Sequence, residues 1–267
     1  MRGAIAAGLL AAALAGAAPV GGAQALRVCA DPNNLPFSNA RGEGFENRLA
    51  ELLAGELGMH VEYTWWAQRR GFARHTLGVG ACDLIVGVPA GWDPVLATRP
   101  YYRSTYVFVW RRDRDLDVRS LDDARLRRLV IGVQLVGDNG VNTPPAHALA
   151  ARGIVDNVRG YSVYGDYATP SPSAAILEAV ARGDVDVAIV WGPLAGYFAE
   201  RLSAPLDWAP VTPAFESPAL PFTFGIAAGV RKDAAVLRDR VQDALDRRAG
   251  DVDAILDAYA VPRAATP

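Results

Sequence analysis

Lysine, histidine and cysteine are scarce in this sequence. Lys232 is the only lysine among 267 residues, and the net charge is −2. Without a basic field, binding to nucleic acid or to an anionic membrane is not expected. The three histidines, His60, His75 and His147, form no H-E-x-x-H pair, and no G-x-S-x-G turn occurs. We therefore predict a chain with no metal site, no cofactor and no catalytic activity, and an enzyme is the least favoured alternative.

Long apolar runs are absent after residue 25, so no later segment approaches the ~20 residues that span a bilayer. The apolar stretch 5–20 follows Arg2 and is rich in Ala, Leu and Gly. Ala23-Gln24-Ala25 is typical of a cleavage site, which predicts a signal peptide over 1–25 and a mature start at Leu26. A membrane anchor is less favoured because no charged stop-transfer flank follows. We expect an exported, soluble protein.

Only two cysteines are present, Cys29 and Cys82. An even number in an oxidising compartment favours a disulfide. Both are expected in or beside strands of one sheet, and a register offset of about three residues would separate them by roughly 10 Å, which is too far to bridge. A disulfide and two buried thiols both remain open.

Strand and helix patterns alternate along the mature chain. Phe45, Leu49, Leu53 and Leu57 recur with the helical period, and Gly58 is typical of a helix end. The expected strands are 26–30, 61–66, 82–88, 101–110, 129–133, 161–164, 185–191 and 222–230. The expected helices are 45–57, 70–77 and 174–182, one that starts at 142–145, and two after residue 235. This alternation predicts parallel sheets with helices on their faces.

The pattern restarts after a run of charges at 111–115, which predicts a second, smaller α/β unit. The last two helices have no sheet of their own, so we expect them to return to the first unit. We predict lobe 1 at 26–110 and 216–267 and lobe 2 at 111–215. The two chain crossings would form a hinge.

Several segments resemble, in order and spacing, the type II periplasmic solute-binding fold. They include LRVCADPNNLPFS, GFENRLAELLAGELG, CDLIVGV and FGIAAGVRKD. The resemblance implies an α/β chain with two lobes, each a mostly parallel sheet flanked by helices, and a two-strand hinge.

A narrower resemblance rests on YTWWAQRRGF, TRPYYRSTYVFV, NTPPA, VYGDY and VWGPLAGYF. These strings are similar to the XoxJ/MxaJ family of periplasmic proteins encoded beside PQQ-dependent methanol dehydrogenases, and more similar to XoxJ, the partner of the lanthanide-dependent enzyme. This implies a periplasmic accessory role in methanol oxidation, in which the chain binds, activates or matures a quinoprotein dehydrogenase, with or without its cytochrome c.

The predicted cleft lies beyond the carboxyl ends of the strands, where doubly wound sheets bind ligands. These positions are rich in Trp, Tyr, Pro and Gly and poor in opposed charges, which predicts a large, mostly apolar cleft with polar points. The candidate residues are Asn33, Phe37, Trp65, Trp66, Arg69, Trp92, Tyr102, Thr143, Tyr164, Asp166 and Trp191. Adjacent strand residues point to opposite faces, so one of Trp65 and Trp66 is equally well explained as core. Arg69 is also consistent with a solvated charge, and Thr143 with an ordinary helix cap.

Amino-acid-binding proteins of this fold hold the ligand carboxylate with an arginine after the third strand and the ammonium with an aspartate in the second lobe. Segment 91–98 contains no arginine, and Val190-Trp191-Gly192 contains no aspartate. A free amino acid is therefore not expected as ligand, unless Arg69 or Asp166 substitutes. The alternative to a dehydrogenase partner is a transport receptor for a small neutral or aromatic solute.

Overall fold

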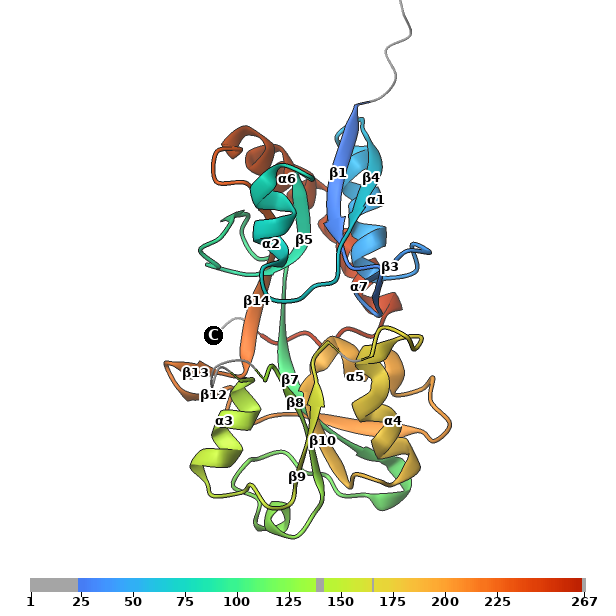
Figure 1. Ribbon diagram of the computed structural model, residues 1–267, viewed down its shortest axis with the longest axis vertical. Coiled ribbons are helices and arrows are strands. Elements are labelled where there is room, and N and C mark those ends of the chain that lie inside the picture. The colour runs from blue at the N-terminus through green and yellow to red at the C-terminus, as the bar shows by residue number, and fades with distance from the viewer. Residues whose placement is uncertain (1–23, 138–141, 165, 266–267) are drawn as a thin grey trace, which may run out of the picture.

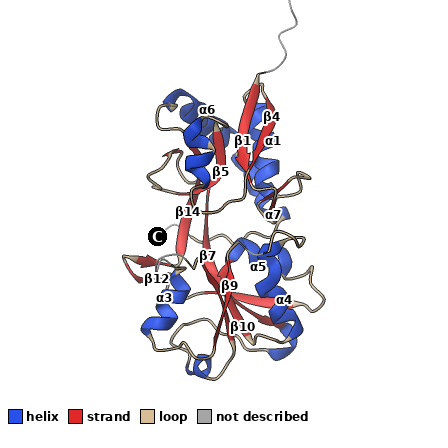
Figure 2. Ribbon diagram, viewed as in Figure 1, coloured by secondary structure: helices blue, strands red, loops and turns tan. Residues whose placement is uncertain are grey.

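The computed structural model describes residues 24–137, 142–164 and 166–265. Most of the predicted signal peptide, residues 1–23, lies outside these ranges. Strands and helices form two groups, one above the other along the longest axis, joined by two long strands (Figures 1 and 2). In the described part, no helix is long and apolar enough to cross a membrane.

The upper group is built on a mixed sheet with helices packed against it. Strand β1 (Ala25–Ala30) lies parallel to β4 (His60–Trp65) and to β5 (Leu84–Pro89), and β5 pairs antiparallel with β14 (Thr223–Val230). Its helices are α1 (Phe45–Glu56), α2 (Phe72–His75), α6 (Ala235–Arg247) and α7 (Ala249–Ala258). The parallel strands follow from the strand–helix alternation of the sequence.

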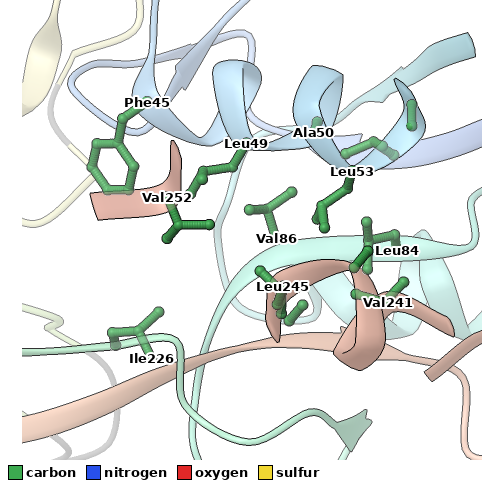
Figure 3. Close-up of a cluster of buried hydrophobic side chains, with 14 of the residues drawn as sticks. Phe45, Leu49, Ala50, Leu53, Leu84, Val86, Ile226, Val241, Leu245 and Val252 are labelled. Carbon is green, nitrogen blue, oxygen red and sulfur yellow. The ribbon is translucent and has the colours of Figure 1, made fainter. Parts of the chain in front are cut away.

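The core of the upper group joins the first helix to the last two. Leu53 of α1 points toward Leu84 of β5, Leu49 of α1 lies beside Val252 of α7, and Val241 of α6 belongs to the same cluster (Figure 3). All five are at most 3% exposed. Full burial of one such side chain contributes about 1.5–3 kcal/mol, so this cluster fixes the C-terminal helices on α1.

The lower group is built on a second set of paired strands. β10 (Val187–Trp191) and β9 (Val158–Ser162) lie parallel to β8 (Ile131–Leu135) on either side. β7 (Tyr102–Arg111) runs antiparallel to both β10 and β11 (Leu206–Pro210). The helices are α3 (Pro144–Ala151), α4 (Ala175–Arg182) and α5 (Gly192–Phe198). The sheets are mixed because β7, β11 and β14 run antiparallel to their neighbours.

Strand β7 belongs to both groups. Its first part, Tyr102 to Thr105, pairs with β14, and from Tyr106 onward it pairs with β10 and β11. The α/β class and the two-strand connection are thus confirmed. Because β7 and β14 reach both groups, no single residue separates them, and the boundaries at 110 and 216 stay a prediction.

The two cysteines form a disulfide. Cys29 and Cys82 have Cα atoms 5.5 Å apart. Val28 pairs with Leu84, so the offset in register is close to the one considered from the sequence. Cys82, however, lies before β5 begins, where the chain bends. The bend is held by a hydrogen bond from Asp83 N to Arg27 O (2.7 Å), and it brings Cys82 beside β1. A straight-strand estimate of the distance is therefore wrong.

Several elements differ from the sequence expectation. The helix expected at 70–77 is only α2, because Thr76 leaves the helical conformation and a short 3-10 turn follows at Leu77–Val79. Helix α5 and strand β11 are not predicted, nor is the hairpin of β12 (Phe215–Ser217) and β13 (Leu220–Pro221). Gly192 and Gly196 lower the helix propensity of α5, which packing must offset, whereas Pro193 lies in the first turn, where proline is tolerated.

Candidate functional site

A pocket of about 220 Å³ lies where the two groups meet, at the ends of β8 and β10 and beside the loops after β1, β4 and β9. Its aromatic lining consists of Phe37, Tyr106, Tyr164 and Trp191. Three of these, Phe37, Tyr164 and Trp191, are among the residues predicted for the cleft. Ligand sites commonly occupy about 300–1,000 Å³. The expectation of a large cleft is therefore wrong, and the loops that meet across it explain why.

The wall beside Trp191 is a triangle of aromatic rings. Tyr106 of β7 and Phe224 of β14 lie edge-on to Trp191, with ring centroids 5.4 Å and 5.9 Å away. Edge-to-face rings each contribute about 0.5–1.5 kcal/mol beyond the area that they bury. The triangle packs β7 and β14, the strands shared by both groups, against the end of β10. It therefore fixes the position of this pocket wall between the two groups.

The polar lining is neutral. Asn34, Gln68, Gln134 and Ser173 supply amide and hydroxyl groups, and Asn34 Nδ2 donates to Gln68 Oε1 over 3.1 Å. No Arg, Lys, Asp or Glu lines the pocket in the described part of the chain. A neutral lining offers no counter-charge for the carboxylate or the ammonium of an amino acid.

Loops from the two groups are fastened together beside the pocket at what we call the clasp, which consists of Asp31, Asn33, Gln68 and Arg69 above and of Tyr164 and residues 166–171 below. The carboxylate of Asp31, 2% exposed, accepts hydrogen bonds from Gln68 N (2.6 Å) and from the Tyr167 hydroxyl. Burial and then this hydrogen bond raise the pKa of Tyr167. The hydroxyl therefore stays protonated and remains a donor.

Asn33 and Arg69 complete the clasp. Asn33 Nδ2 donates to Thr169 O over 2.9 Å, and Ser171 N donates to Asn33 Oδ1 over 3.2 Å. The Arg69 guanidinium carbon lies 4.9 Å from the ring centroid of Tyr167 and 5.9 Å from that of Tyr164. Such cation–π contacts contribute about 0.5–2 kcal/mol each. Asn33 and Arg69 thus hold the two loops together and do not line the pocket.

The remaining predicted residues lie elsewhere. Trp65 stacks on Tyr63 at 4.4 Å, and Tyr102 is buried in the upper core against Phe45. Trp92 packs on the cluster around the disulfide. For these three, packing explains the aromatic side chain, and none lines the pocket.

Trp66, Thr143 and Asp166 also lie outside the pocket lining. Trp66 is 49% exposed, and Thr143 precedes α3 with its hydroxyl bonded to Gln134 O at 2.6 Å. Asp166 accepts a hydrogen bond from Ala168 N within its own loop. The end of strand β8 is followed by the loop that leads to Thr143, which was also expected to face the cleft, and residues 138–141 of this loop lie outside the described residues.

Glu46, in the first turn of α1, is a partly buried acid that the sequence pattern does not reveal. Its carboxyl lies against Gly87 of β5, where any side chain would collide with Oε1. Burial, and then the charge of Asp31, raise its pKa from 4.5 to about 8. An acid in the first turn of a helix is common, so nothing in the sequence separates this carboxyl from a solvated one.

A larger groove of about 470 Å³ lies on the lower group, along Trp110 and Trp208. Arg112 lines it and is already paired with Glu200 (2.6 Å) and Asp207 (2.8 Å). The smaller pocket is the candidate site, because it lies at the carboxyl ends of strands where ligands bind in this fold class. Within the described ranges, no three His, Cys, Asp or Glu side chains are placed to hold a metal ion.

Comparison with known proteins identifies the family. No protein-family model matches the chain. Protein MoxJ of Methylorubrum extorquens is 31% identical over 244 residues, which cover 89% of this chain and 81% of that protein. The crystal structure of the periplasmic binding protein XoxJ from Methylobacterium extorquens AM1 is 36% identical, with a TM-score of 0.74 over 90% of this chain and all of that one.

A second similar structure is an ancestral cationic amino acid solute-binding protein, 21% identical with a TM-score of 0.68 over 88% of this chain and 95% of that one. At this identity it supports the fold alone, which is that of type II periplasmic solute-binding proteins. Protein MoxJ matches over most of the length of both proteins, and the XoxJ structure agrees with it. The chain therefore belongs to the MoxJ family of periplasmic binding-type proteins.

Proposed function

We propose that this protein is a non-catalytic periplasmic accessory protein that assists or activates a PQQ-dependent methanol dehydrogenase of the lanthanide type. The observation that carries the proposal is its membership of the MoxJ family together with its likeness to XoxJ. The pocket agrees with a role other than amino-acid capture, because it is small, neutral and bordered by the clasp.

The test uses the dehydrogenase encoded in the same organism. We expect the mature protein to form a complex with it in a pull-down, or to raise its rate of methanol oxidation with an artificial electron acceptor. An arginine-binding protein of the same fold is the matched control. If the protein neither binds the enzyme nor changes its rate, the proposal is wrong.

A periplasmic location is part of this proposal. The predicted signal peptide and the Cys29–Cys82 disulfide support it, since disulfides persist in oxidising compartments. Cell fractionation should recover the protein with periplasmic markers, cleaved before Leu26. Recovery of the uncleaved chain in the cytoplasmic fraction would contradict it.

A second candidate function is a receptor for a small neutral or aromatic solute. The aromatic and amide lining of the pocket favours it. A ligand at 100 times its Kd would add about 2.7 kcal/mol to the stability, which a thermal-shift screen detects. A broad metabolite screen without a shift would count against this function, and a neighbouring permease gene would favour it.

A further inference from the structure

Residues 63–82, which run from the end of β4 almost to the start of β5, carry basic residues and no acidic ones. No Asp or Glu occurs between Glu62 and Asp83, whereas Arg69, Arg70 and Arg74 do. The flanking carboxylates are engaged elsewhere, because Asp83 pairs with Arg27 at 2.6 Å and Glu62 pairs with His60. The whole chain has a net charge of −2, so the excess of positive charge is a feature of this segment and not of the whole chain.

These arginines lie together on the surface with two ring side chains; we call Trp66, Arg69, Arg70, Arg74 and His75 the basic patch. All five are exposed. The Trp66 and His75 rings stack with centroids 6.0 Å apart, and Arg74 Nη2 lies 3.3 Å from His75 Nε2. The chain turns at Gly71 with a φ of +86°, a value that favours glycine.

Most other surface arginines differ from those of the patch. Arg112 and Arg152, for example, each bridge two carboxylates. No ion pair joins Arg69, Arg70 or Arg74 to a carboxylate of the described residues. Unpaired arginines beside a half-exposed tryptophan have the composition of protein–protein contact sites, where Trp, Tyr and Arg dominate the binding energy.

We propose that the basic patch is a docking surface for an acidic face of the partner dehydrogenase. This inference rests on the proposed function and names the face of this protein that would meet the enzyme. Charge complementarity selects the partner, because three guanidinium groups attract carboxylates and repel basic surfaces. Arg69 belongs to both the patch and the clasp, so a docking carboxylate competes with the rings of Tyr164 and Tyr167 for its guanidinium.

The test reverses the charge of two exposed residues that the clasp does not use. The Arg70→Glu/Arg74→Glu variant is compared with Arg128→Glu/Arg240→Glu, two exposed arginines on other faces. We expect the wild type to bind immobilised dehydrogenase more tightly at low than at high salt. The patch variant should lose at least tenfold in affinity, and Trp66→Ala severalfold, while the control binds as the wild type does.

Equal binding by the wild type and the patch variant would overturn the docking surface and leave the accessory function standing. If the wild type does not bind the dehydrogenase, poly-L-glutamate at low salt serves as the probe, and the proposed function itself fails only if the rate of the enzyme is unchanged as well. Retention of the wild type and the control, but not of the patch variant, would support an acidic partner. No retention of the wild type would overturn the basic patch as well.

Discussion

At the scale of single residues, Glu46 should make stability depend on pH. In the unfolded chain its carboxyl ionises near pH 4.5, whereas in the folded protein its pKa is about 8. The folded state therefore holds the proton longer, and the contribution of Glu46 to stability is full below pH 4.5 and is lost as the pH rises to about 8. Each unit of pKa difference corresponds to about 1.4 kcal/mol.

Glu46→Gln removes this ionisation. We expect the difference in unfolding free energy between the variant and the wild type to shift in favour of the variant by a few kcal/mol from pH 4.5 to pH 8. The scale is about 1.4 kcal/mol for each unit of pKa difference. Thermal unfolding at several pH values measures the difference. Glu51→Gln, on the exposed side of the same helix, is the control. Parallel pH profiles for the wild type and Glu46→Gln would contradict the raised pKa of Glu46.

The pocket residues could be predicted only in part, for reasons that lie at the residue scale. Phe37, Tyr164 and Trp191 follow from the rule that ligands lie beyond strand ends. Asn34 lines the pocket where Asn33 was expected, because the turn geometry decides which of two adjacent residues faces inward. Tyr106 lies inside a strand, so its place on the wall depends on how β7 passes between the groups.

At the scale of elements, the disulfide ties β1 to the residues just before β5. It spans 53 residues of sequence. By loop-closure entropy, a link of this span stabilises the fold by about 4 kcal/mol. We expect Cys29→Ser/Cys82→Ser to lower the unfolding free energy by about 2–5 kcal/mol in urea. Reduction of the wild type should give the same loss, and an unchanged midpoint would contradict the prediction.

Helix α5 depends on a glycine that approaches another segment. A side chain on Gly196 would collide with Ala260 O, just after α7. Gly196→Ala should therefore cost about 1–3 kcal/mol, as overpacking usually does. The control is Gly250→Ala in α7, where a Cβ would meet nothing within 4 Å. It should be neutral or stabilising by up to about 1 kcal/mol. Equal effects of the two substitutions on the melting temperature would contradict this packing argument.

Long, regular elements were predictable, and those held by tertiary contacts were not. The stripe that ends at Gly58 predicts α1, because it buries one face and a glycine with positive φ follows. Helix α5 has glycines inside it, and it packs on the core of the lower group and closely against Ala260, contacts that no local pattern reveals. The disulfide depended on a bend before β5, which a straight-strand estimate leaves out.

At the scale of the whole molecule, the clasp should govern how far the two groups separate. Tyr167→Phe removes the hydroxyl bound to the buried Asp31 carboxylate. A hydrogen bond to a charged group contributes about 1.5–3 kcal/mol, so we expect the ratio of open to closed molecules to rise at least tenfold. Small-angle X-ray scattering should then give a larger radius of gyration.

The control for the clasp is Tyr161→Phe, which replaces a partly buried tyrosine that packs on the core of the lower group. Its scattering profile should match that of the wild type. The clasp would have no role in closure if Tyr167→Phe and the double variant Asn33→Ala/Tyr167→Phe both scattered as the wild type does.

The exchange of partners along β7 has one mechanical consequence. Thr105 is the last residue paired with β14 and Tyr106 the first paired with β10, while Tyr106 N is bound to Phe222 O at 2.9 Å. Any swing of one half against the other twists the backbone at this rung, because the ladders on both sides are continuous. Deuterium uptake at the Tyr106 amide would therefore report this movement without an added label.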